Sequence, residues 1–187
     1  HPLLAGKVED ASHFADEEHL YSQLLVALIE AAQKKILEFI DEKNPGLEDK
    51  ELIARQIGIS ALTFNDLKNR RLMDVKFDWD SVMSFEGATG PYVQNAHVRL
   101  CSIMRKAGYS VSAKDVDWKA IEDEYSYELI RKLSAKGERI AQACEADEPS
   151  VLAQYALEIA ESAHRFIHND RVLGSAEEKS RLFLVQS

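Results

Sequence analysis

Two histidines lie one helical turn apart in the C-terminal third of the sequence. His164 and His168 are separated by four residues, and this spacing would let two imidazoles on one helix face bind a zinc ion together. A zinc site needs further Cys, His or carboxylate ligands, and none stands at a matching position. We therefore predict no metal site, and we expect both histidines to be exposed or to face a partner.

Three carboxylates, Asp78, Asp80 and Glu86, lie close to Trp79 and Phe85. Such a group could transfer protons, but carboxylates in loops beside aromatic residues more often accept hydrogen bonds or cap helices. The sequence also lacks a phosphate-binding loop, a dinucleotide fingerprint and a His-Glu-x-x-His motif. We therefore predict no catalytic residue in this chain.

The composition is that of a globular protein. The chain has 187 residues, is 45% hydrophobic and carries a net charge of −9. It contains no apolar run of the roughly 20 residues that span a bilayer, and no basic segment followed by an apolar stretch at its start. Cys101 and Cys144 show neither metal-type spacing nor a disulfide framework. We therefore expect a cytoplasmic protein that does not contact a membrane.

Positive charge is concentrated in two segments despite the acidic total. Arg99, Arg105 and Lys106 occur between residues 91 and 110 without any acid, and residues 131–139 contain four Lys or Arg against Glu138 alone. An acidic body with separate basic faces suits a selective polyanion binder. Ordinary solvated helix faces would give the same pattern, so both interpretations remain open at this point.

The elements that must position these residues are almost all helical. Apolar residues recur at three-to-four spacing in six segments, which we expect to be helices: Leu20 to Asn44, Glu48 to Leu67, Pro91 to Gly108, Ile121 onward with a continuation or restart to Cys144, Pro149 to Gly174, and a last one from Ala176. Residues 68–76 are basic and loop-like, and only Asp74 to Trp79 could form a strand. The predicted fold class is all-α, a helical bundle.

A polar link at residues 111–117 is the expected boundary between a segment at 1–110 and a helical domain at 111–187. The last segment, Glu177 to Ser187, ends partway through an apolar pattern without a cap or a breaker. Helices usually end at such a signal. We therefore expect the second domain to be truncated at its C-terminus and the natural protein to continue.

One contiguous stretch resembles a known family. Phe77-Asp78-Trp79-Asp80, followed by "SFEGATGPYVQ" from Ser84 to Gln94, resembles the signature of the arginyl-tRNA synthetases, FDWD and then SFEG-x-TGPY-x-Q. The neighbouring stretches "EKNPGLEDKE", "IGISALTFNDLKNRR" and "NAHVRLCSIMRKAG" resemble the family in the same order. From Leu152 to Leu173 the chain resembles the helical anticodon-binding module of that family. The resemblance covers about residues 36–187 and does not extend to residues 1–20.

The resemblance implies a helical bundle of the class I anticodon-binding type, which grips the anticodon stem and loop of arginine tRNA. In the family, a preceding catalytic domain makes arginyl-adenylate from arginine and ATP and then transfers arginine to the tRNA. Its His-Ile-Gly-His and Lys-Met-Ser-Lys-Ser type motifs are not in this chain. This region is therefore expected to bind tRNA without charging it and to hold no cofactor, while ATP and arginine bind the catalytic domain of the same polypeptide.

The expected tRNA contacts come from basic and polar side chains, because unpaired bases stack on planar groups while Lys and Arg hold phosphates. The full set is Arg99, Arg105, Arg70, Arg71, Gln94, His164, His168 and Arg171. Where the family commonly has Phe-Tyr-His, this chain has Phe166-Ile167-His168, so stacking is expected to move to one of the two histidines. The affinity of this chain alone is expected to be weak.

The loop before residue 91 is expected to have a structural role. Gly87 and Gly90 permit backbone angles that other residues avoid, Thr89 can cap the next helix and Pro91 can start it. Glu86 belongs to the same loop. For Glu86 and Thr89, a tight connector and a binding role both remain open.

Two other functions stay possible at the level of the sequence. The leucine-rich stripe from Leu24 to Ile40 could dock a partner helix, which would make the chain a helical protein-interaction module. The chain could also be the anticodon domain of another class I synthetase, although the SFEG-x-TGPY stretch favours arginine. The sequence gives neither the oligomeric state nor the tRNA bases that are read.

Overall fold

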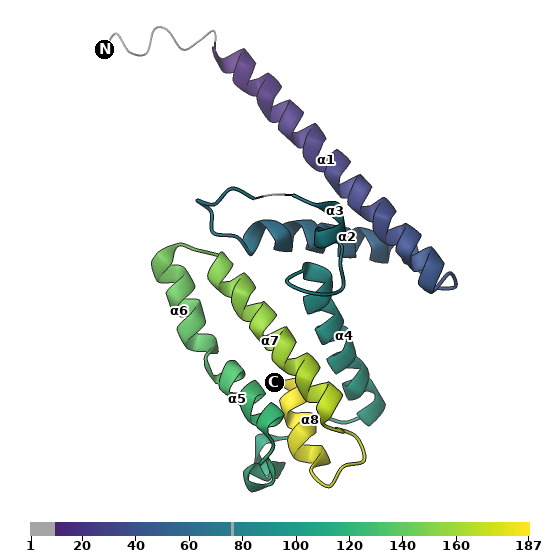
Figure 1. Ribbon diagram of the computed structural model, residues 1–187, viewed down its shortest axis with the longest axis vertical. Helices are drawn as coiled ribbons and strands as arrows, with labels where there is room; N and C mark the ends of the chain where they lie inside the picture. Colours follow the sequence, from purple (N-terminus) through teal and green to yellow (C-terminus); the bar gives the residue numbers. More distant parts are fainter. Residues whose placement is uncertain (1–9, 76) are drawn as a thin grey trace. The chain divides into compact units, whose positions relative to one another are not determined.

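The computed structural model describes residues 10–75 and 77–187, and these ranges contain helices and loops but no strand. The predicted all-α fold class is confirmed, and Asp74 to Trp79, the possible strand, forms none. The helices are shown in Figure 1: α1 (Asp10–Lys43), α2 (Lys50–Leu67), α3 (Trp79–Val82), α4 (Gly90–Ala107), α5 (Glu124–Ser134), α6 (Lys136–Ala146), α7 (Ser150–Asn169) and α8 (Glu178–Gln186), with 3-10 turns at η1 (Ala113–Asp115) and η2 (Trp118–Ala120). Among the described residues, no helix combines the length and apolar composition needed to cross a lipid bilayer.

The chain divides by packing into two compact units, one ending at Leu62 and one from Thr63 to Ser187. In the first unit, Ala32, Ile36 and Ile40 of α1 are buried. Gly58 of α2 lies so close to α1 that a Cβ atom built there would be 3.1 Å from the Ala32 backbone. The glycine that interrupts the apolar pattern of α2 therefore marks a close helix–helix contact. The predicted domain boundary at residues 111–117 falls inside the second of these units, and it stays a prediction.

In the second unit, α7 is the central helix and contacts α4, α5 and α6. Its Phe166 and Ala163 are fully buried, together with Leu129 of α5 and Leu182 of α8. Ile167, which stands where an aromatic residue was expected, packs against this core. The apolar positions of α7 therefore hold the bundle together, and its charged positions, such as Glu161 and Arg165, stay exposed.

Helix α8 fastens the link that follows α4. The Gln186 side chain accepts from the backbone N–H of Val111 at 3.0 Å and donates to its carbonyl at 2.5 Å. The Ser180 hydroxyl does the same for Asp117, accepting and donating at 3.1 Å. Because both contacts satisfy backbone groups of an irregular segment, the link at 111–117 is fixed although it has little secondary structure.

Candidate nucleic-acid interface

The loop before α4 sets where that helix begins. The Thr89 side chain donates to the Ser84 carbonyl at 2.6 Å and accepts from the backbone N–H of Tyr92 at 3.1 Å, which caps α4. Gly87 has a φ of +77°, a backbone conformation that favours glycine. Pro91 lies in the first turn of α4 and is buried, whereas Glu86 is exposed. The loop thereby fixes the positions of Phe85, which belongs to the loop, and of Tyr92, which lies in the first turn of α4.

An open cleft of about 550 Å³ lies between α4 and the second half of α7. We call it the aromatic cleft. It is lined by Phe85, Tyr92, Asn95, Arg99, Glu161, His164, Arg165, His168 and Asn169. The cleft thus combines aromatic faces with hydrogen-bond donors and acceptors, which is the composition expected where a flat heterocyclic ring is bound.

Three groups in this cleft hold one another in place. The Tyr92 and His164 rings have centroids 4.7 Å apart with a tilt of 50°. Arg99 Nη1 also lies 3.1 Å from His164 Nδ1. Since a guanidinium can only donate, Nδ1 of this histidine must be the acceptor and the ring must be neutral.

Burial and charge agree with a neutral His164. Burial lowers the pKa of His164, a hydrogen bond with the Tyr92 backbone opposes this shift, and the positive charge of Arg99 lowers the pKa further, so the net pKa lies below its ordinary value. The pKa of the Tyr92 hydroxyl is raised, first by burial and then by Glu161. At neutral pH the cleft therefore contains an uncharged imidazole and an uncharged phenol, and Arg99, Arg165 and Glu161 supply its charges.

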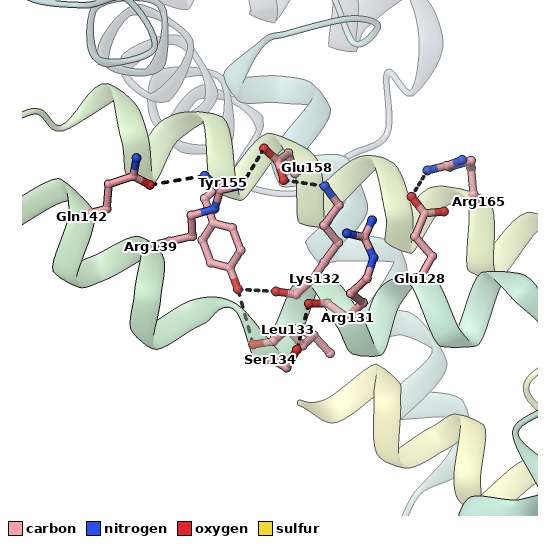
Figure 2. Close-up of polar contacts among 10 residues, drawn as sticks. All are labelled: Glu128, Arg131, Lys132, Leu133, Ser134, Arg139, Gln142, Tyr155, Glu158 and Arg165. Carbon is pink, nitrogen blue, oxygen red and sulfur yellow. Dashed lines mark hydrogen bonds and ion pairs between the residues drawn. The ribbon is translucent and has the colours of Figure 1, made fainter.

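Helix α7, which forms one wall of the cleft, is tied to α5 and α6 by polar contacts (Figure 2). Lys132 of α5 and Arg139 of α6 both pair with Glu158 of α7, at 2.5 Å and 3.6 Å. Tyr155 donates to the Lys132 carbonyl at 2.8 Å, just before α5 gives way to α6. Arg165 pairs with Glu128 of α5, which holds this arginine at the edge of the aromatic cleft.

The structure brings three of the predicted contact residues together, since Arg99, His164 and His168 all line the aromatic cleft. Arg70 and Arg71 line a second cleft, beside Lys68 and Arg139. The remaining three lie outside both clefts. Arg105 is exposed in the last turn of α4, Gln94 is half-buried, and Arg171 donates from Nε to the Leu173 carbonyl at 3.0 Å.

Sequence reasoning missed several residues of the aromatic cleft, among them Tyr92, Asn95, Glu161 and Arg165. Tyr92 stands at an apolar position of its helix, where an aromatic residue is expected to join the core. A signal for Glu161 and Arg165 was present on α7, because residues 161, 165 and 168 follow the three-to-four spacing of one helix face. Among the residues that the structure describes, no three His, Cys, Asp or Glu side chains gather as possible metal ligands.

The family model of the DALR anticodon-binding domain matches residues 93–187, just over half of the chain, and the chain belongs to this family. The matched region runs from α4 to α8 and includes most of the aromatic cleft.

The relatives and solved structures that this chain resembles include arginine–tRNA ligases, also called arginyl-tRNA synthetases. The chain is 41% identical over 163 residues to arginine–tRNA ligase 1 of Bacillus cereus, and 42% identical over 165 residues to the arginine–tRNA ligase of Ligilactobacillus salivarius. These matches cover 87% and 88% of this chain but 28% and 29% of the relatives. The chain thus spans less than a third of the length of these relatives, and the match lies in their C-terminal part.

The backbone agrees with solved structures of the same group. The arginyl-tRNA synthetase of Thermus thermophilus matches with a TM-score of 0.76 and 35% identity, over 86% of this chain and 28% of that one. The enzyme of Plasmodium falciparum matches with a TM-score of 0.70 and 25% identity, over 87% and 29%. The resemblance to arginyl-tRNA synthetases that the sequence predicts is therefore confirmed.

Proposed function

We propose that this chain binds the anticodon arm of an arginine tRNA, and that the aromatic cleft receives an unpaired base of the anticodon loop. Membership of the DALR anticodon-binding domain family supports the kind of RNA, and the names of the relatives support arginine. The observation on which the proposal rests is that residues of α4 and α7 enclose a cleft with aromatic faces and polar edges, and that its lining residues other than Phe85 and Tyr92 lie inside the matched region.

The side chains of the cleft suit a base better than a phosphate. Phe85 and Tyr92 offer faces for stacking, which contributes about 1–3 kcal/mol per base. The Glu161 carboxylate would repel a phosphate but can accept from the exocyclic amino group of a base. Asn95 and Asn169 provide both donors and acceptors.

The charges at the rim fit the rest of the nucleotide. Arg99 is held by His164 and Arg165 by Glu128, so both guanidinium groups are positioned before RNA binds. Pre-positioned arginines lose less rotamer freedom on binding, and their planar groups suit phosphate recognition. We also propose that Arg105, exposed on α4, meets a phosphate outside the cleft. Arg171 contributes indirectly, because its Nε donates to the Leu173 carbonyl and holds the segment after α7.

We infer further that this region belongs to an enzyme that ligates arginine to its tRNA with ATP. The named relatives are arginine–tRNA ligases of greater length. This chain has no His-Ile-Gly-His or Lys-Met-Ser-Lys-Ser type motif, so ATP and arginine would bind a catalytic domain of the same polypeptide. Such an enzyme would act in the cytoplasm, where translation takes place.

The proposal is tested by mobility shift of the chain with arginine tRNA and with an anticodon-altered copy, each at two salt concentrations. We expect tighter binding of the unaltered tRNA at both concentrations, and weaker binding of both RNAs at high salt. Equal affinity for the two RNAs would contradict recognition of the anticodon.

The interaction-module alternative has one observation in its favour. Leu24, Leu25 and Leu28 of α1 are 52%, 58% and 37% exposed, although the later part of the same stripe is buried at Ile36 and Ile40. A partner helix bound to these leucines would stay bound at high salt, because apolar contacts are not screened. A salt-resistant protein complex without RNA affinity would therefore favour this alternative.

A further inference from the structure

A second cleft, of about 600 Å³, lies where the chain leaving α2 meets α6 and the start of α7. We call it the basic cleft. Its walls include four cationic side chains, Lys68, Arg70, Arg71 and Arg139, and one acid, Glu148. Among the residues that the structure describes, none of those lining this cleft is aromatic, and the charge balance of the lining is opposite to that of the whole chain.

Two of the cations are fixed by neighbouring groups. Lys68 Nζ donates to the Ala88 carbonyl at 2.9 Å, and burial lowers the pKa of this ammonium group. Arg139 is held by Glu158 at 3.6 Å. A partly buried cation attracts an anion more strongly than a fully solvated one, because less water screens the interaction.

Arg70 and Arg71 are the exposed pair of the basic cleft. Glu148 lies near Arg71. Burial raises the pKa of Glu148, but hydrogen bonds from Ser150 and the backbone and charge of Arg71 outweigh it, so the net pKa is lowered. This carboxylate is therefore ionised at neutral pH and offsets one of the four positive charges. Glu158 pairs with a second, Arg139, and the lining of the cleft remains net positive.

Both clefts lie along one face of α7. Gln154 lines the basic cleft, and Glu161 and Arg165 line the aromatic cleft, seven and eleven residues further on. At about 100° and about 1.5 Å per residue, these positions fall within about 20° of one face and about 10–17 Å apart along the axis. The long helix running through the second unit in Figure 1 thus connects the two clefts.

We propose that the basic cleft holds the phosphodiester backbone of the same RNA whose base enters the aromatic cleft. This inference rests on the proposed function. The second half of α7 would take part in recognising the base, and its first half would take part in binding phosphate. At about 3.4 Å per nucleotide of a helical strand, the spacing corresponds to about three to five nucleotides. The basic cleft contributes affinity that does not depend on sequence, because phosphates are the same in every RNA.

The test is the double variant Arg70→Gln/Arg71→Gln in the full chain. Its matched control is Lys114→Gln/Lys179→Gln, which removes the same charge from exposed lysines outside both clefts. Affinity is measured for arginine tRNA and for the anticodon-altered copy over a range of salt concentrations. We expect the arginine variant to bind both RNAs about tenfold more weakly than the control, with the ratio between them unchanged.

The salt dependence gives a second readout. Each lost phosphate contact lowers the slope of log affinity against log salt by about 0.7–0.9, so the arginine variant should be less steep than the control by about 1.5. If the arginine variant showed the same affinity and the same slope as the control, the proposal would be overturned. The basic cleft would then be a candidate site for an acidic protein partner instead. A wild-type chain that does not discriminate between the two RNAs would refute anticodon recognition, whatever the arginine variant does. A wild-type chain that binds neither RNA would refute both proposals.

Discussion

At the scale of single residues, Tyr92 is the side chain on which base recognition depends most. Its ring packs on His164 inside the aromatic cleft, and its backbone N–H is held by the Thr89 cap. Because an aliphatic side chain can fill this space but cannot stack on a base in the same way, Tyr92→Leu should weaken RNA binding by about 1–3 kcal/mol. Tyr92→Phe keeps the ring and is the control, measured by mobility shift beside a circular dichroism check of folding. Equal losses for both variants would mean that the hydroxyl, and not the ring, makes the contact.

Two carboxyl groups share one arginine where α7 ends and α5 begins, Asp170 at the end of α7 and Asp123 at the start of α5. Arg181 Nη2 lies 3.6 Å from a carboxylate oxygen of each. Burial raises the pKa of Asp170, and the neighbouring Asp123 carboxyl raises it further, to about 6. Burial also raises the pKa of Asp123, but hydrogen bonds from Ser126 and Asp170 and the Arg181 charge outweigh it, so that the net pKa is lowered.

The raised pKa of Asp170 makes the stability of the fold depend on pH. The folded state binds the Asp170 proton more tightly than the unfolded state, so this group stabilises the fold at low pH, and the contribution is lost as the pH rises from about 4 to 6. At about 1.4 kcal/mol per pKa unit, the loss is about 3 kcal/mol at most. Asp170→Asn should remove this loss, so the variant should match or exceed the wild type in urea unfolding at pH 7. The free energy of unfolding of the variant minus that of the wild type should be larger at pH 7 than at pH 4.5. A difference that is smaller at pH 7 would refute this explanation.

The residues of the aromatic cleft could be predicted only in part. His164 and His168 stand out because a helix brings residues four apart onto one face, and Arg99 stands out because its segment has no acids. Tyr92 was hidden because an aromatic residue at an apolar position of a helix normally joins the core. Glu161 was hidden because an acid on a helix is ordinarily solvated, and only the packing of α4 against α7 places it opposite Asn95 and Arg99.

At the scale of elements, α8 holds the bundle together at the end opposite the first turn of α7. Leu182 of α8 is fully buried in the core, whereas Leu152 of α7 is 41% exposed. Leu182→Ala should therefore lower the free energy of unfolding by about 2–5 kcal/mol, because it leaves a cavity among well-packed neighbours. Leu152→Ala is the matched control and should cost less than about 1 kcal/mol. Thermal or urea unfolding checks both, and equal effects would mean that α8 is not part of the cooperative core.

The helices themselves were largely predictable, because apolar spacing follows the helical period from residue to residue. The details of their ends were not. The sequence left open whether the helix after Ile121 continued to Cys144, and the structure breaks it into α5 and α6 at Ala135. Asp123 accepts from the Ser126 N–H at 2.7 Å and so begins α5 three residues later than the apolar pattern suggested. Asp78 likewise caps the short helix α3 where a strand had been considered.

At the scale of the whole molecule, an acidic protein with two basic sites should bind RNA in a defined orientation. Six cations line the two clefts: Arg99 and Arg165 in one, and Lys68, Arg70, Arg71 and Arg139 in the other. If each of these six and Arg105 met one phosphate of an unpaired strand, log affinity would fall with log salt with a slope no steeper than about −5. Titrations at several salt concentrations measure this slope. A value near zero would show that phosphates contribute little, and a much steeper one would require basic residues elsewhere.

The family was predictable from the sequence because its signature is contiguous, from Phe77 to Gln94. The two clefts were harder to predict, because each is lined by segments that are far apart in the sequence. Arg99 and His164 are 65 residues apart, and Lys68 and Gln154 are 86 apart, yet each pair is joined by a hydrogen bond. Such pairings follow from tertiary packing, which neither periodicity nor local charge encodes.

Photo-crosslinking would show directly whether the aromatic cleft holds a base of the anticodon loop. A tRNA carrying one photoreactive base in its anticodon loop is bound to the chain and irradiated, and the crosslinked peptides are identified by mass spectrometry. The account predicts crosslinks to the start of α4, around Tyr92, and to the second half of α7, around His164 and His168. Crosslinks confined to α1, or found equally when the photoreactive base is moved to the acceptor stem, would contradict it.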